Sequence, residues 1–237
     1  MKSAMTSCLL MVLLAGAAAA QSLSTMPVPK GEHWLNRVNR DVAKVRQGGW
    51  ELVFIGDSIT DAWQNTGKAE WEHYFGQYKA LNLGVSADCT EHVLWRLEHG
   101  ELEGDGPKLF VLMIGTNNTG HRRPDQESTA DTVAGIKAIL DILGQKAPRS
   151  KVLLLAIFPR GATPKYGDRL RNEAVNAEIQ KFADNTRVFW MNINDKFLQP
   201  DGTLSKEIMP DLTHPNAKGY AIWAEAIMPF VKKTLGR

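Results

Sequence analysis

The sequence predicts a single three-layer α/β domain, in which a five-stranded parallel sheet of flavodoxin-like strand order 2-1-3-4-5 has helices on both faces. Short apolar runs, typical of strands buried on both faces, alternate with segments whose apolar residues recur at helical spacing. No internal repeat or low-complexity segment interrupts this alternation. The 237 residues, 43% hydrophobic and 23% charged, suffice for one well-buried domain.

The alternation predicts each element in turn. The predicted strands span residues 52–56, 78–84, 108–114, 151–158 and 187–192. The predicted helices span residues 34 to about 48, 69–74, 91–98, about 125–145, 168–184 and 215–235. Right-handed crossovers between successive strands then place helices on both faces of the sheet.

Residues 1–20 match a secretory signal peptide, because Lys2 precedes an apolar stretch that ends in small residues at Ala20. The stretch is too short for a convincing membrane span, and no other long apolar run follows. We expect a linker over residues 21–30 and a folded domain over residues 31–237. The mature protein is expected in the periplasm or outside the cell, with no stable membrane insertion.

Charge and cysteine content exclude several function classes. The formal net charge is +2 and no sustained basic face accompanies it, so no nucleic-acid partner is expected. Cys8 lies in the predicted signal peptide, which leaves Cys89 without an internal disulfide partner. Cys89 and His92 are three positions apart, but no zinc-binding pattern supplies further ligands. We expect neither a metal nor an organic cofactor, and the oligomeric state stays open.

Three polar positions follow neighbouring strands of the predicted sheet. In the order 2-1-3, Gly84, Ser58 and Asn117 lie in one row at the carboxyl edge, where open α/β sheets bind ligands. A serine hydroxyl can attack an ester carbonyl, and the backbone N–H groups of Ser58 and Gly84 with the Asn117 amide can stabilise the resulting oxyanion. Each position also has a purely structural interpretation as a helix cap, a strand end or a turn.

A candidate base appears near the other end of the chain. Asp211 precedes His214 by three positions, and such an acid can hold the imidazole in one tautomer. Pro215 suits the first position of the last predicted helix and would stiffen this turn. The alternatives are an ordinary helix start with an exposed histidine and, less well supported, metal ligation.

With these residues in place, the chain from about Glu51 to its C-terminus resembles the SGNH, or GDSL-like, hydrolases. The resemblance implies that Ser58 is the nucleophile, His214 the base and Asp211 its orienting acid, with oxyanion donors from Ser58, Gly84 and Asn117. It rests on four short blocks in the expected order: Gly56-Asp57-Ser58, Asn82-Leu83-Gly84, Gly115-Thr116-Asn117-Asn118 and Asp211-Leu212-Thr213-His214-Pro215.

Within that family the chain is most similar to the catalytic subunits of intracellular platelet-activating-factor acetylhydrolase. This likeness rests on further segments, namely residues 92–97, 100–102 and 159–161. Ala87 is a departure, because the subgroup usually has a second glycine shortly after the first. The predicted signal peptide is another, so the lipid substrate of the intracellular enzymes is not carried over. Thr60 stands where a lipase-type Gly-x-Ser-x-Gly elbow would have its last glycine.

The sequence thus predicts an exported serine esterase that removes acetyl or other short acyl groups from a carbohydrate or lipid through an acyl-enzyme. Ile59, Trp63 and Thr213 are candidates for the substrate pocket, with core packing as the alternative. One rival function is a lysophospholipase or thioesterase that acts on longer acyl chains. Another is a non-catalytic carbohydrate-binding module. Further candidates for lining the site, with a structural role as the alternative, are Arg96, His121, Arg160 and Tyr166.

Overall fold

The computed structural model describes residues 22–237, so the predicted signal peptide lies outside the described residues. The sheet has five parallel strands in the order β2-β1-β3-β4-β5. The strands are β1 (Leu52–Gly56), β2 (Ala80–Gly84), β3 (Leu109–Met113), β4 (Lys151–Leu155) and β5 (Val188–Met191). The predicted fold class and strand order are confirmed.

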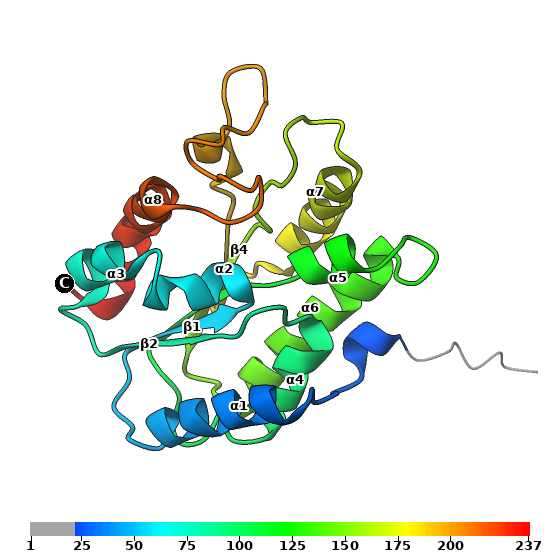
Figure 1. Cartoon of the computed structure of the whole chain (residues 1–237). Coiled ribbons are helices and arrows are strands. Elements are labelled where there is room, and N and C mark those ends of the chain that lie inside the picture. The colour runs from blue at the N-terminus through cyan, green and yellow to red at the C-terminus, as the bar shows by residue number, and fades with distance from the viewer. Residues whose placement is uncertain (1–21) are drawn as a thin grey trace, which may run out of the picture.

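Helices surround the sheet (Figure 1). The longer ones are α1 (Glu32–Val45), α3 (Lys68–Phe75), α4 (Thr90–Glu98), α6 (Thr129–Lys146), α7 (Gly167–Ile179) and α8 (Ala217–Leu235). The short ones are η1 (Leu23–Thr25), α2 (Ser58–Asp61), η2 (Ala62–Gln64), α5 (Thr116–His121), η3 (Gln180–Phe182) and η4 (Asn194–Phe197). Among residues 22–237, no helix combines the length and the apolar composition needed to cross a bilayer.

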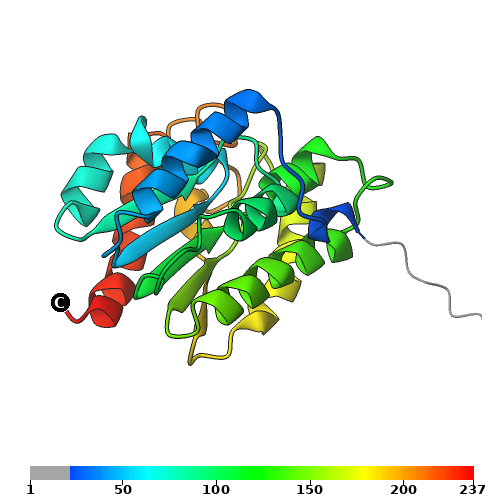
Figure 2. The same ribbon diagram turned by 90° about the horizontal axis from the view of Figure 1, so that it is seen from below.

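Side chains that alternate along each strand supply two hydrophobic cores, one on each face of the sheet. Leu52 and Phe54 of β1 face the core formed with α3 and α8, whereas Val53 and Ile55 face the core formed with α4, α6 and α7. Figure 2 shows the sheet enclosed between these helix layers. Both faces of β1 are therefore buried, which explains its uninterrupted apolar run.

The structure differs from the sequence prediction at several element ends. The last helix begins at Ala217, where the Asn216 side chain accepts a hydrogen bond from the Gly219 N–H, so Pro215 precedes the cap and does not open the helix. Asp131 completes a capping box with Ser128 that starts α6 at Thr129. The short helices α2 and α5 carry too few residues for a periodic signal.

Residues 22–30, within the segment expected to be a linker, pack on the folded domain. Among them, Leu23–Thr25 form η1, and Ser24 is completely buried. Thr90 donates a hydrogen bond of 2.9 Å to the Ser24 carbonyl, and Val28 donates one of 3.3 Å to the Glu91 carbonyl. The segment therefore covers the start of α4 and belongs to the architecture near the oxyanion residues.

Candidate active site

Ser58 lies at the carboxyl end of the central strand β1, as the first residue of α2. The preceding residue, Asp57, caps this helix, because its Oδ1 accepts a hydrogen bond of 3.0 Å from the Ile59 N–H. No hydrogen bond from the Ser58 N–H to another group occurs within residues 22–237. The strand end thus presents a hydroxyl and a backbone donor together.

Ser58, His214 and Asp211 form a hydrogen-bonded chain, although Ser58 and His214 are 156 positions apart in the sequence. The Ser58 Oγ is 2.8 Å from His214 Nε2, and His214 Nδ1 is 2.6 Å from Asp211 Oδ2. When Nδ1 donates its proton to Asp211, Nε2 is left to accept the proton of the serine hydroxyl. The geometry is that of a nucleophile, a base and an orienting acid.

The turn that carries Asp211 and His214 is held mainly by hydrogen bonds from its backbone N–H groups to the Asp211 side chain. Asp211 Oδ1 accepts hydrogen bonds from the N–H groups of Thr213, at 3.0 Å, and His214, at 2.7 Å. Partial burial works to raise the pKa of Asp211, but these bonds and the His214 ring outweigh it and lower the pKa. Leu212 has a φ of 60°, which is unusual for a residue with a side chain. Asp211 is therefore kept ionised beside the imidazole.

Asn117 is placed beside the loop that follows β2. Its side chain is 5% exposed, and Nδ2 donates a hydrogen bond of 2.8 Å to the Asp88 carbonyl. An amide nitrogen carries two protons, so one donor of Asn117 stays available for a substrate oxygen. Asn117 lies in the first turn of α5, directly after β3, as the predicted row at the sheet edge requires.

Gly84 is placed at the same edge, but its N–H is already used. It donates a hydrogen bond of 2.8 Å to Asn82 Oδ1. A Cβ at Gly84 would collide with the backbone of α2 at Thr60 and Asp61, which explains the need for glycine there. The structure therefore gives Gly84 a packing role and does not support it as an oxyanion donor.

Ala87 is a backbone donor that the sequence reasoning missed. It is exposed in the loop after β2 and has a φ of 61°, a conformation that favours glycine. Its carbonyl accepts a hydrogen bond of 2.7 Å from Lys30, and the next carbonyl, of Asp88, is held by Asn117. No hydrogen bond from the Ala87 N–H to another group occurs within residues 22–237. The second glycine of the resembling subgroup is the signal that could have identified this position.

A buried ion cluster supports the loop that carries Ala87. Asp88 accepts hydrogen bonds from Trp34, Lys30 and Arg96, at 2.8, 2.9 and 2.8 Å. The guanidinium of Arg96 is completely buried, forms an ion pair with Glu101 and donates to the carbonyls of Leu83 and Gly56 at the ends of β2 and β1. The sequence allowed Arg96 either to line the site or to have a structural role. Its contacts show the structural role, which is to support the loop after β2.

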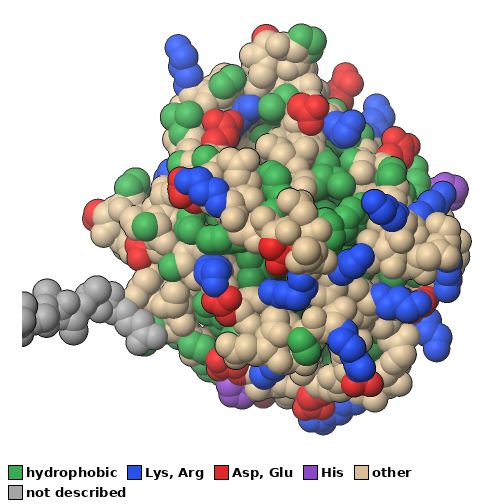
Figure 3. Space-filling view, turned by 180° about the vertical axis from the view of Figure 1, so that it is seen from behind, with side chains coloured by type: hydrophobic (Ala, Val, Ile, Leu, Met, Phe, Trp, Pro, Cys, Tyr) green, Lys and Arg blue, Asp and Glu red, His purple; other side chains and the backbone are tan. Residues whose placement is uncertain are grey.

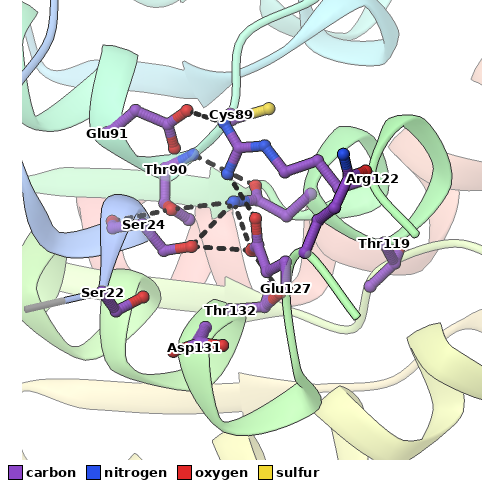
Figure 4. A network of polar contacts seen from close by, with 12 residues as sticks. Ser22, Ser24, Cys89, Thr90, Glu91, Thr119, Arg122, Glu127, Asp131 and Thr132 are labelled. Atoms are coloured by element: carbon purple, nitrogen blue, oxygen red, sulfur yellow. Dashed lines mark hydrogen bonds and ion pairs between the residues drawn. The ribbon is translucent and has the colours of Figure 1, made fainter. Parts of the chain in front are cut away.

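A second polar network holds α5 (Figure 4). Glu127 is 3% exposed, and its Oε1 accepts hydrogen bonds from Ser24, Asn118 and Thr132, at 2.7, 2.8 and 2.8 Å. The other carboxylate oxygen pairs with Arg122, which also pairs with Glu91. Because Asn118 follows Asn117, this network fixes the helix that presents the candidate oxyanion donor.

Asp57 carries a further buried carboxyl group beneath the serine. It is completely buried, and its Oδ2 has no hydrogen-bond partner within residues 22–237. Burial raises the pKa of Asp57 to about 7, although the Ile59 N–H and the charge of His214 oppose this shift. The carboxyl group therefore titrates in the neutral range, and its protonated form is favoured by folding.

The predicted pocket residues have different surroundings. Trp63 is 1% exposed and packs among Phe54, Trp71, Tyr220 and other aromatic rings of one core, so the structure contradicts its assignment to the substrate pocket. Ile59 is also buried, although it directly follows Ser58, and its carbonyl accepts a hydrogen bond from the Tyr220 hydroxyl.

Thr213 and His121 are at more accessible positions. Thr213 is partly exposed and directly precedes His214. Of the three predicted pocket residues, it is therefore the one whose surface is accessible beside the base. His121 is an exposed residue at the end of α5. Tyr166 is exposed and lies against Gly161, in the loop between β4 and α7.

The structure adds Glu91 to Cys89 and His92, and their candidate ligand atoms lie within 4.8 Å of one another. However, the Cys89 N–H donates a hydrogen bond of 2.8 Å to His92 Nδ1, which leaves the proton of the neutral ring on Nε2. Burial also raises the pKa of the Cys89 thiol to about 12, and Glu91 is paired with Arg122. These contacts favour a helix cap over a metal site.

Comparison with known proteins identifies the family. Residues 54–222 match the GDSL-like lipase/acylhydrolase family model. The chain is 35% identical over 208 residues to human platelet-activating factor acetylhydrolase IB subunit alpha1, covering 86% of this chain and 85% of that protein. It is 34% identical over 194 residues to the rat alpha2 subunit, covering 80% of each.

Solved structures agree in fold. A putative acylhydrolase from Bacteroides fragilis matches with a TM-score of 0.70 at 20% identity, covering 87% of this chain and 99% of that one. An acetyl xylan esterase, AlAXEase, matches with a TM-score of 0.64 at 20% identity, covering 76% and 99%. The family match and the identity to the curated relatives show that this chain belongs to the GDSL-like lipase/acylhydrolase family and is a carboxylic ester hydrolase.

Proposed function

We propose that the protein is an exported serine esterase that removes acetyl or other short acyl groups, with Ser58 as its nucleophile. The observation that carries the assignment is the hydrogen-bonded chain from Ser58 through His214 to Asp211. His214 Nε2 accepts the serine proton while Oγ forms a bond to the ester carbonyl carbon. The imidazolium then donates this proton to the departing alcohol, and water activated by His214 hydrolyses the acyl-enzyme.

We further propose that the oxyanion is bound by the Ser58 N–H, the Asn117 amide and the Ala87 N–H. This set replaces Gly84, whose N–H is bonded to Asn82. The shared contact of Asn117 and the Ala87–Asp88 segment supports it, because it places two donors next to each other. A single donor of this kind typically contributes about 10²- to 10³-fold in rate.

Acetyl is the preferred acyl group in this proposal. The curated relatives are named acetylhydrolases, and one structural neighbour is an acetyl xylan esterase. Because residues 1–20 have the pattern of a signal peptide, we place the substrate outside the cytoplasm and favour an acetylated carbohydrate. Export to the periplasm or the medium is expected to remove residues 1–20.

The proposal is tested with p-nitrophenyl acetate, butyrate and octanoate as substrates of the wild type and of the Ser58→Ala and His214→Ala variants. We expect the acetate to be hydrolysed fastest and both variants to lose activity. Faster octanoate hydrolysis would favour a lysophospholipase or thioesterase. Polysaccharide binding without turnover, unchanged in Ser58→Ala, would favour a non-catalytic binding module.

A further inference from the structure

Arg160 lies between the two halves of the candidate site. It follows β4, and its Nη1 donates a hydrogen bond of 3.0 Å to the carbonyl of Thr116, the residue before Asn117. The next residue, Gly161, donates a hydrogen bond of 2.8 Å to the carbonyl of Leu212, within the histidine turn. The backbone of this loop and the side chain of Arg160 therefore connect the oxyanion helix with the turn that carries His214.

The guanidinium of Arg160 has unused donors. Its side chain is 14% exposed, and its Nε is buried without a hydrogen-bond partner within residues 22–237. The carboxylate of Asp168 is 3.8 Å from Nε, which is too long for a hydrogen bond. No hydrogen bond from Nη2 occurs in the same part of the chain. A largely buried cation with so few acceptors is unfavourable unless another group supplies them.

Two other arginines near the site, Arg96 and Arg122, are paired with carboxylates. Arg96 pairs with Asp88 and Glu101, and Arg122 pairs with Glu91 and Glu127. Charge pairing in those two cases explains the burial without a ligand. Arg160 alone among these three has no carboxylate within hydrogen-bond distance, since Asp168 is 3.8 Å away, so its Nη2 group is available to a substrate group.

Positively charged side chains lie near His121, at the end of α5. Burial lowers the pKa of His121, and the charges of Arg160 and Lys30 lower it further, against an opposing effect of Asp168. Lys30 reaches the same region, because its ammonium donates to the Ala87 carbonyl. By contrast, positive and negative side chains are interspersed on the face shown in Figure 3. Because Lys30 is paired with Asp88, Arg160 is the cation of this region that can attract an anion.

The chain also leaves space for this arginine. A Cβ at Gly120 would collide with Nη1 of Arg160, so glycine at that position lets the guanidinium lie directly against α5. The exposed ring of Tyr166 lies against Gly161, next to Arg160 in the chain. A ring of the alcohol group could therefore lie beside an aromatic surface while its anionic substituent reaches Arg160.

We propose that Arg160 binds an oxyanion, a carboxylate or a phosphate, on the alcohol part of the ester. The inference rests on the proposed esterase function and narrows its substrate class to esters whose alcohol is anionic. The Nη2 group of the planar guanidinium, which donates no hydrogen bond within residues 22–237, suits an oxygen of such a group, whereas Nε is buried.

The test compares matched aryl acetates that differ in charge. The substrates are 4-acetoxybenzoate, 4-acetoxyphenyl phosphate and the neutral 4-acetoxybenzamide, and the proteins are the wild type, Arg160→Gln, Arg160→Lys and Arg123→Gln. Arg123 is an exposed residue just after α5, so its variant controls for the loss of one positive charge. For each protein, kcat/KM for an anionic ester is divided by kcat/KM for the neutral ester. General damage to the enzyme lowers both values alike and therefore leaves the ratio unchanged.

We expect the wild type to favour an anionic ester, and Arg160→Gln to reduce that preference about tenfold through KM, as for the loss of one charge-assisted hydrogen bond. Arg160→Lys should retain part of it, and Arg123→Gln all of it. Preference for the benzoate or for the phosphate identifies the oxyanion. An unchanged ratio in Arg160→Gln, or an equal loss on all three esters, would overturn the proposal. A wild type inactive on all three, including the neutral one, would instead overturn the esterase function on which it rests.

Discussion

The serine side and the histidine side of the candidate site are built differently. Ser58, Ala87 and Asn117 stand on elements tied by buried groups, since Asp88 and Arg96 are completely buried and Glu127 nearly so. The side chains of His214 and Asp211 are 42% and 57% exposed and depend on hydrogen bonds within their own turn. The donors of the oxyanion are thus fixed by buried tertiary contacts. The base is fixed mainly by a local turn, whose Leu212 carbonyl also accepts a hydrogen bond from Gly161.

This difference separates the effects of substitutions. Groups on the serine side contribute to the free energy of unfolding as well as to catalysis, because a buried polar group that loses its partner destabilises the fold. Groups on the histidine side are solvated, so their loss changes the reaction with little effect on stability. Paired measurements of turnover and unfolding can therefore test the comparison.

A large effect on activity with little effect on stability is expected for Asp211→Asn. The variant keeps the shape of the turn but no longer holds the imidazole in the tautomer that accepts the serine proton, so kcat should fall by up to about 10⁴-fold. The free energy of unfolding should change by less than about 1 kcal/mol, because the side chain is exposed. Steady-state kinetics with p-nitrophenyl acetate and urea unfolding measure the two quantities. A large loss of stability would contradict the local character of the turn.

The largest effect on stability is expected for Asp88→Ala. It leaves Arg96 buried without one of its carboxylate partners, which typically costs about 3–5 kcal/mol. Removal of the exposed Asp125, paired with Arg123 on the surface, is the matched control and should cost about 0–1 kcal/mol. Urea unfolding of both variants compares them, and equal losses would show that burial of the cluster is unimportant.

Asp57→Asn should make stability less dependent on pH. The raised pKa of Asp57, about 7 against an ordinary value of 3.8, means that folding favours the protonated form. This stabilisation is complete below pH 4 and is lost as the pH rises to 7, so the variant should gain on the order of 3 kcal/mol relative to the wild type over that range. Unfolding at pH 4, 5.5 and 7 measures the difference. A difference that does not vary with pH would show that Asp57 does not titrate there.

A smaller effect is expected for Ser24→Ala. It removes one donor to Glu127 and should cost about 1–2 kcal/mol, with a modest fall in kcat because α5 is held less firmly. Thr25→Ala is the matched control, because the Thr25 hydroxyl bonds only to Ser22 in its own turn. Equal effects of the two substitutions would show that the contact with Glu127 does not hold the oxyanion helix.

The same contrast explains what could be predicted from the sequence. The alternation of apolar runs with helical spacing is a local pattern that predicts the fold and the strand order. The short motifs around Ser58 and His214 are local too, and the family that they resemble implies the candidate triad. The role of Gly84 could not be predicted, because it depends on the side chain of Asn82 and on the approach of α2. Likewise, the sequence does not distinguish a pocket position from a core position for Trp63. The aromatic rings that surround it in the structure decide for the core.

The polar clusters were missed for the same physical reason. Glu127 receives hydrogen bonds from Ser24 and Asn118, which lie 103 and 9 positions away, and no motif joins them. Arg96 and Glu101 fall in a segment that resembles the family, but resemblance does not reveal that they are buried under the ends of β1 and β2. Tertiary contacts assign these roles.

The most direct test of the central claim is covalent labelling by diethyl p-nitrophenyl phosphate, followed by mass spectrometry of the intact protein and its peptides. A phosphoryl group should be transferred once, to Ser58, as p-nitrophenol is released. Labelling should be absent in Ser58→Ala and much slower in His214→Ala, which lacks the base. A label on another residue, or labelling undiminished in Ser58→Ala, would contradict the assignment of Ser58 as the nucleophile.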